Sequence, residues 1–502
     1  DRPDVLLLLG ACAFRRGDLE ASLSANEAAL RGDPAFAEAH SNLANTYREL
    51  GDIESAIQLY QRAIFLKPGF VDAHSNLAAA CIAAGRAQLA VPVLRRLAAL
   101  TPGSADAHLQ LGHVLRAQGN LAAADQAFAA AVHADPLSEA AWSCAAQTAQ
   151  DLGQRDRAAH AYQRVLAINP GNAEARCNLG NCYKELGALD LAIECYQGAI
   201  RAAPGFAIAH GNLAGALFER RDLPGAVAEY RRALEADPSF ADAYNNLGNA
   251  LKELGRLEEA IQAYQQALRA RPDHHHAYNN LGNALKDRGD GAGAKQCYRA
   301  ALGLQPAFAA AHSNLASLLK DEGKTAEAIA HYEEAIRVDP FFADAYYNLG
   351  NTLKDLGRLH EAADRYVFAV RARPRFPEAL SNLAATYKDL GRVAEAVACY
   401  EEAIAARPWF PDAFANLVHA RTFIASWSNY EAQHRELERV IDLQLARGEC
   451  PAVQPFHAFV YPLPLRKVKA LSAAYAAKSE AWARAMHPPG RAATPHARGP
   501  PG

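Results

Sequence analysis

Residues 238–271 read PSFADAYNNLGNALKELGRLEEAIQAYQQALRAR, and stretches of the same pattern fill most of the 502-residue chain. Each stretch begins at a proline, and twelve such prolines follow one another at intervals of 34 residues: Pro34, Pro68, Pro102, Pro136, Pro170, Pro204, Pro238, Pro272, Pro306, Pro340, Pro374 and Pro408. A fixed period of this length is typical of helical arrays in which each repeat contacts only its neighbours. The chain is therefore expected to be one extended array instead of several globular domains.

The residues between two prolines predict a pair of helices. Counting the proline as position 0, position 9 is nearly always Leu, 10 is small, 17 is Gly, 22 is Ala and 26 is aromatic. In the quoted repeat these residues are Leu247, Gly248, Gly255, Ala260 and Tyr264. The apolar spacing predicts helix A from about position 3 to 16, and the Gly at 17 ends it because glycine adopts a left-handed cap at least cost. Helix B then runs to about position 31, and the next proline closes the repeat.

This pattern resembles the tetratricopeptide repeat family over roughly residues 1–420. The resemblance implies an all-α, right-handed solenoid of antiparallel helix pairs. We expect an array over residues 1–421, made of one partial repeat, eleven complete repeats and a final helix A from Pro408 to about Arg421. One repeat carries Arg221 in place of the glycine and Pro224 soon after, so its turn is expected to be altered.

The period stops after residue 421. Residues 422–486 are interpreted as a helical junction, with helices over 431–446 and 466–486 and a proline-rich loop over 448–464. Residues 487–502 lack periodicity and are rich in Pro, Gly, Ala, Arg and His, so they are expected to be disordered.

Composition limits the classes of function. The net charge of −3 indicates no strong attraction to nucleic acid or to an anionic membrane, and no apolar run reaches membrane-spanning length. The nine cysteines are scattered through the predicted helices, and Cys195, Cys297 and Cys399 share repeat position 25, which is repeat register and not a disulfide framework. With no secretory signal, reduced thiols and a cytoplasmic or nuclear location are favoured. No metal site is expected, because the side chains of His274, His275 and His276 diverge by about 100° per residue at a helix start.

Helix A carries a candidate binding face. Position 8 is Asn in most repeats, position 11 is often a second Asn, and position 4 is often acidic, as Glu174 is. These positions share one side of the helix, and an amide offers both a donor and an acceptor to an extended peptide backbone. The acidic residues add contacts to basic or hydroxyl side chains. The candidate substrate-binding residues are Asn178, Asn212, Asn246, Asn280, Asn314, Asn348, Asn382 and Asn416.

A solvated amide face that binds nothing is the alternative, since Asn-Leu-Gly is common in these repeats. The unbroken run of asparagines from Asn178 to Asn416 favours binding of extended protein segments. Whether the chain forms a homodimer is left open.

A second constellation follows the repeats. Asn416-Leu417-Val418-His419 precedes Gln454-Pro455-Phe456-His457-Ala458, and then comes Tyr461-Pro462. These residues resemble the junction between repeats and catalytic region in the protein O-GlcNAc transferases, with the spacing of the plant-type enzymes. The resemblance covers the array and about the next 65 residues.

The resemblance implies transfer of N-acetylglucosamine from UDP-GlcNAc to Ser or Thr of intracellular proteins, with the repeats guiding the protein substrate. It also implies that His457 is catalytic, as a base near the acceptor hydroxyl. Phe456 and Tyr461 are expected to orient its imidazole.

The chain departs from that family after Met486, where no alternation of strands and helices and no candidate UDP site appears. The chain alone, with no cofactor of its own, is therefore expected to transfer no sugar. The alternatives are a non-enzymatic scaffold for protein–protein interaction and a relative of the protein O-fucosyltransferases, which also carry N-terminal repeats of this kind. The Gln454–Ala458 motif favours the O-GlcNAc family.

Overall fold

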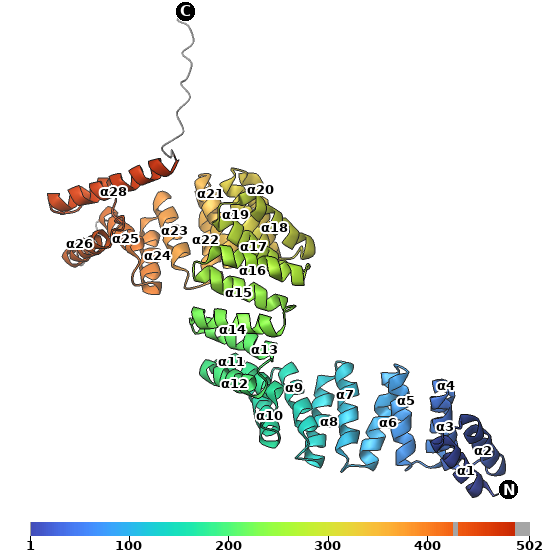
Figure 1. Ribbon diagram of the computed structural model, residues 1–502. Helices are drawn as coiled ribbons and strands as arrows, with labels where there is room; N and C mark the ends of the chain where they lie inside the picture. The colour runs from blue at the N-terminus through green and yellow to red at the C-terminus, as the bar shows by residue number, and fades with distance from the viewer. Residues whose placement is uncertain (1, 425–429, 487–502) are drawn as a thin grey trace, which may run out of the picture. The chain divides into compact units, whose positions relative to one another are not determined.

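The computed structural model describes residues 2–424 and 430–486, which form helices and no strand (Figure 1). The chain divides into two units, residues 1–270 and 271–502, and each is described by itself. No helix in the described ranges is long and apolar enough to cross a membrane.

The helices of the first unit are α1 (Pro3–Arg15), α2 (Leu19–Gly32), α3 (Ala37–Glu49), α4 (Ile53–Leu66), α5 (Val71–Ala83), α6 (Ala87–Leu100), α7 (Ala105–Ala117), α8 (Leu121–Ala134), α9 (Glu139–Asp151), α10 (Arg155–Ile168), α11 (Ala173–Glu185), α12 (Leu189–Ala202), α13 (Ala207–Glu219), α14 (Leu223–Ala236), α15 (Ala241–Glu253) and α16 (Leu257–Ala270). Those of the second unit are α17 (His275–Asp287), α18 (Gly291–Leu304), α19 (Ala309–Asp321), α20 (Thr325–Val338), α21 (Ala343–Asp355), α22 (Leu359–Ala372), α23 (Pro377–Asp389), α24 (Val393–Ala406), α25 (Pro411–Phe423), α26 (Tyr430–Ala446), α27 (Pro455–Ala458) and α28 (Leu465–Met486).

The predicted helix pairs are confirmed. In each complete repeat, helix A covers positions 3–15 and helix B covers positions 19–32, as in α15 and α16. Within each unit a helix packs mainly against its partner in the pair and against the first helix of the next pair. The residue before the following proline leaves the helical region, with φ −142° and ψ 95° at Asp33 and φ −136° and ψ 92° at Arg373, because the proline ring disfavours helical backbone at the preceding residue.

The turn between the two helices depends on a left-handed residue at position 17. The glycines there have φ between 70° and 91°, and Arg221 takes φ 67° in the one exception. The amide of Asp222 donates to the carbonyl of Leu217 at 2.9 Å, as Arg256 donates to Leu251 at 2.9 Å in the next repeat. The expectation of an altered turn at this repeat is therefore wrong. Pro224 fits because it lies in the first helical turn, where its missing N–H is not needed.

Most hairpins are held by an aromatic ring at position 26 that lies on the small residue at position 10; Leu94 takes this place in the repeat that opens at Pro68. The Ala at position 22 is fully buried in every complete repeat, and eight tyrosines and Phe128 at position 26 are under 2% exposed. A Cβ added at Gly282 would lie 2.6 Å from Cε1 of Tyr298, and Gly248 and Gly350 meet their tyrosine rings at similar distances. The backbone of helix A therefore contacts the ring directly.

The segment after the repeats is helical, as predicted, and packs onto the last helix A. Helices α26 and α28 match the two predicted helices, whereas the short α27 lies inside the segment predicted as a loop. Ala415 and Val418 of α25 share a core with Leu437, Ile441 and Leu471. The predicted disordered tail, residues 487–502, lies outside the described residues.

The contact between ring and glycine makes a test of the hairpin core. We expect Gly282→Ala to lower the local free energy of unfolding by about 1–2 kcal/mol, because overpacking against the buried Tyr298 outweighs the gain in helix propensity. Gly303 lies in helix α18 with open space around its Cα. Gly303→Ala should therefore stabilise the same repeat by up to about 1 kcal/mol.

Amide hydrogen exchange across α17 and α18 measures both effects. Ala stands at position 10 in other repeats, so the Gly282→Ala variant is expected to fold. Equal protection in the Gly282→Ala chain and its parent would show that the ring adapts without cost.

Candidate functional site

The eight predicted asparagines lie on one surface of helix A, which we call the amide face and define by positions 8 and 11. In the first unit it includes Asn178, Asn212 and Asn246, and in the second Asn280, Asn314, Asn348, Asn382 and Asn416. Asn246 is exposed and the other seven are half-buried, so each side chain reaches the surface from a fixed base.

Several of these asparagines are held by the preceding repeat. Asn212 donates from Nδ2 to Oδ1 of Asn181 at 3.0 Å, and Oδ1 of Asn181 also accepts from the hydroxyl of Tyr196 at 2.8 Å. The same three-residue arrangement joins Asn382, Asn351 and Tyr366, at 2.8 and 2.7 Å. A chain of hydrogen bonds thus runs from the buried ring at position 26 to the amide on the surface of the next repeat.

This internal role was missed from the sequence, although it had a signal there. Asn at position 11 stands 15 residues before Tyr at position 26, and Tyr264 and Tyr298 bond to Asn249 and Asn283 at 2.8 Å with the same spacing. Part of the asparagine pattern therefore serves the joint between repeats.

At Asn212 and Asn382 both amide hydrogens are used within the array. Asn212 also donates from Nδ2 to Sγ of Cys177 at 3.3 Å, and Asn382 also donates from Nδ2 to the hydroxyl of Tyr347 at 3.2 Å. With both amide hydrogens occupied, such an asparagine can offer a new partner only its oxygen, as an acceptor. Backbone N–H groups of an extended segment are suitable donors for these oxygens.

His457 lies in α27, half-buried against the last repeat. Its ring stacks on His419 of α25 with centroids 4.3 Å apart and an angle of 24° between the planes. Tyr461 lies instead against His434, at 5.6 Å, and Phe456 is 79% exposed, with its ring 6.3 Å from His457. His419, more than the two predicted aromatic residues, therefore orients the imidazole.

The surface around His457 is apolar and uncovered. Phe456, Phe459, Val460 and Leu465 are each more than half exposed.

The three consecutive histidines occupy different environments. His274 is the buried N-cap of α17, where its Nδ1 accepts from the amide of Ala277 at 3.4 Å. His275 and His276 both lie edge-on to Phe308. Across residues 2–424 and 430–486, no three His, Cys, Asp or Glu side chains are grouped to hold a metal ion.

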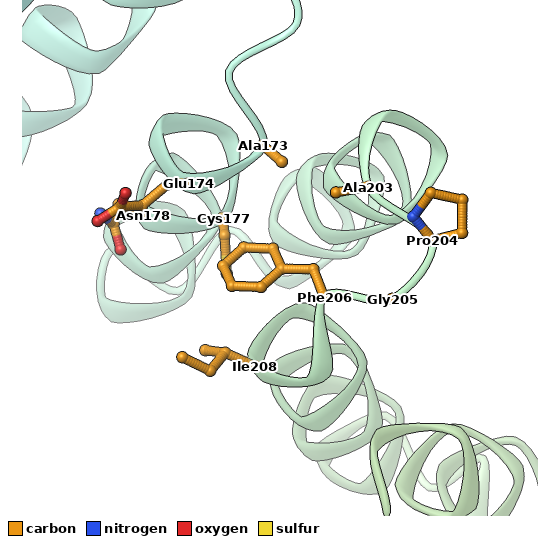
Figure 2. Close-up of a pocket in the computed structure, with 9 residues that line it drawn as sticks. All are labelled: Ala173, Glu174, Cys177, Asn178, Ala203, Pro204, Gly205, Phe206 and Ile208. Atoms are coloured by element: carbon orange, nitrogen blue, oxygen red, sulfur yellow. The ribbon is translucent and has the colours of Figure 1, made fainter. Parts of the chain in front are cut away.

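A hollow opens on the first unit beside the amide face. It has a volume of about 600 Å³ and lies where helix α11 meets the loop before α13. Figure 2 shows the ring of Phe206 between Cys177 and Ile208, with Glu174 and Asn178 at one side of the ring.

Comparison with known proteins identifies the repeats. The family described as cilia and flagella-associated protein 70 C-terminal domain matches residues 4–243. Tetratricopeptide repeat families match residues 212–275 and 347–409, residues 316–357 and residues 275–308. No curated protein matches the chain.

Solved structures are similar to this chain either over most of its length at low sequence identity or over about a third of its length at higher identity. A chain in the crystal structure of the APC/C hetero-tetramer Cut9-Hcn1 is 15% identical to this chain, with a TM-score of 0.43. The match covers 84% of this chain and 96% of the matched chain. Two structures of MamA have 28% and 27% identity and TM-scores of 0.30 and 0.31, over 32% and 34% of this chain and 94% and 92% of theirs. With the repeat matches from residue 4 to residue 409 and the helix pairs on which they fall, the chain is an all-α array of tetratricopeptide repeats.

Proposed function

We propose that this chain is a protein-interaction array that holds an extended protein segment along the amide face. The observation that carries the proposal is a half-buried asparagine, seen at Asn212 and Asn382, whose two N–H groups are bonded inside the array, so that its remaining capacity for a new partner is that of an acceptor. Fixed acceptors at a regular spacing suit main-chain N–H groups, which every protein segment carries. The face therefore favours extended backbone over a particular sequence.

A second candidate is a narrower form of the first: the array selects protein substrates for an O-GlcNAc transferase. It is supported by the Gln454–Ala458 motif and by the position of His457, beside exposed apolar side chains and packed on the final helix A. In this function the segment held by the array would present a Ser or Thr hydroxyl to His457. UDP-GlcNAc would be bound by a catalytic region of the family.

His419, the residue that stacks on His457, is uncharged near neutral pH. Burial, followed by the charges of His457 and Lys388, lowers the pKa of His419 to about 4. His419 is therefore uncharged near neutral pH and brings no positive charge against the imidazole of His457. A histidine that acts as a base must itself be neutral before it accepts a proton.

The amide face is tested by replacing Asn280, Asn314, Asn348, Asn382 and Asn416 together by Ala. We expect binding to immobilised 12-residue peptides of random sequence to weaken by several kcal/mol at most, since each neutral hydrogen bond contributes about 0.5–1.5 kcal/mol. Circular dichroism should show that helicity is retained.

The matched control changes exposed residues of helix B in the same unit, Gln296, Glu333 and Asp364, to Ala. That control chain should bind peptides like its parent. If the chain with all five asparagines replaced by Ala bound peptides as tightly as its parent, the amide face would have a purely structural role.

The role of His457 is tested in an enzyme that joins this chain to the catalytic lobes of the transferase family. His457→Ala should lower turnover roughly 10²–10⁴-fold if the imidazole acts as a base, with UDP-GlcNAc affinity and melting temperature little changed. Phe456→Ala is the control at the exposed neighbouring residue. A loss of activity that follows a loss of thermal stability would assign His457 to packing against His419.

The pKa of His419 gives a prediction for the joint itself. Because the folded state holds this pKa below its usual value of 6.5, the unfolded state binds the proton more readily. The stabilising contribution is complete above about pH 6.5 and is lost as the pH falls through about 4. Hydrogen-exchange protection of α25 and α26 should fall over this range more in the parent than in His419→Gln, and an equal fall in both would contradict the assignment.

A further inference from the structure

Three joints between repeats are closed by a basic side chain of the chain itself. Lys67, the residue before a repeat proline, pairs through Nζ with Glu38 at 2.7 Å and lies 5.0 Å from the ring centre of Phe70. The acid stands at position 4 of one repeat, and the cation stands at position 33 of the same repeat, just after helix B. The aromatic ring stands at position 2 of the following repeat. The same three positions pair Arg373 with Asp344 over Phe376, and Arg407 with Glu378 over Phe410.

The joint at Pro204 keeps the acid and the ring but lacks the cation. Glu174 occupies position 4 and Phe206 occupies position 2, while Ala203 stands where the other joints carry Lys or Arg. Glu174 makes no ion pair with any residue in the described part of the chain. The hollow of about 600 Å³ lies at this joint and is lined by both Glu174 and Phe206 (Figure 2).

The backbone at Ala203 has the geometry that carries the cation elsewhere. Its φ and ψ are −140° and 89°, compared with −135° and 85° at Lys67 and −136° and 92° at Arg373. The hollow therefore results from the missing side chain and not from a different course of the chain.

Other joints without a basic residue do not reproduce this arrangement. Asp72 is followed by Thr101 and Ser104, and Asp106 is followed by Asp135 and Ser138, so both joints lack the ring. The joint at Pro34 has the ring of Phe36, but its acid, Asp4, already pairs with Arg2 at 2.6 Å. At Pro204 the hollow also has an apolar wall, because Ile208 stands at position 4, where most other repeats have an acid.

We propose that the hollow beside Glu174 and Phe206 binds the side chain of a lysine or arginine from the protein segment held on the amide face. The inference rests on the proposed function and adds a preference to it. The ammonium or guanidinium would pair with Glu174 and lie over the ring of Phe206, as Lys67 does with Glu38 and Phe70. The methylene groups of the guest side chain would pack on Cys177 and Ile208.

The site is directly beside the amide face, so one segment can reach both. Asn178 belongs to the amide face and lines the hollow, and Asn212 bonds to Cys177 on its floor. A segment whose main chain lies along these asparagines therefore carries its side chain past Glu174.

A small probe tests the site without the rest of the segment. Nα-acetyl-arginine methylamide, titrated against the full chain, should shift the side-chain methyl resonance of Ile208 in a saturable way. Nα-acetyl-norleucine methylamide has a similar apolar stem without the charge and should not. Glu174→Gln should weaken the arginine probe about fivefold, as expected for one partly exposed ion pair, and Ala203→Arg should abolish the shift by filling the hollow from within.

The control is Glu378→Gln, at a joint already occupied by Arg407, which should leave the Ile208 response unchanged. Circular dichroism of Ala203→Arg should match the parent, since Arg occupies the same backbone conformation at Arg373 and Arg407. An equal response to the arginine and norleucine probes, or a full response in Ala203→Arg, would overturn the inference.

A second experiment separates this inference from the proposed function. Peptides captured from a random 12-residue library should be enriched in Lys or Arg at one position with the parent chain, and the enrichment should disappear with Ala203→Arg. Capture without that enrichment overturns this inference and leaves the proposed function standing. Capture of no peptide at all overturns the proposed function, and with it the claim that the guest belongs to a protein segment.

Discussion

The direct contact between a buried aromatic ring and the backbone of helix A sets the distance between the two helices of a repeat. Where position 10 is glycine, as at Gly282, the ring of the following tyrosine occupies the space that a Cβ would need. The ring is also the inner end of a hydrogen-bond chain, because its hydroxyl reaches the Asn at position 11, and that Asn holds the amide of the next repeat at Asn212 and Asn382. The packing of each core thus determines where the surface amides lie.

The period, the helix pairs and the junction helices could be predicted because each depends on residues close together in the sequence. The turn at Arg221 could not, since its left-handed φ is imposed by the two helices that it joins and not by its own preference. The short helix α27 was missed for a similar reason: its four residues are too few for a periodic pattern, and the buried Ala458 and Tyr461 fix it against the last repeat.

The placement of the candidate asparagines on helix A could be predicted from the sequence, but the hydrogen bonds that they make could not. The sequence placed the asparagines on one face, but it did not show that their N–H groups are used between repeats, because a hydrogen bond between residues 31 positions apart depends on how two repeats stack. Likewise the stacking of His457 on His419 joins residues 38 apart. The hollow at Pro204 could be recognised only by comparing the joints, because it lies where other joints carry a Lys or Arg side chain and this one has Ala203.

The hydrogen bond from one repeat to the next also gives the amide face a polarity. Both Asn212 and Asn382 are held from the N-terminal side, by Asn181 and Asn351 of the repeat before. A row of acceptors that are all anchored from the same end differs when it is followed forwards and backwards. A polypeptide has a direction of its own, so under the proposed function the two ways of laying a segment along such a row would be unequal in free energy, and the array would favour one orientation of the segment.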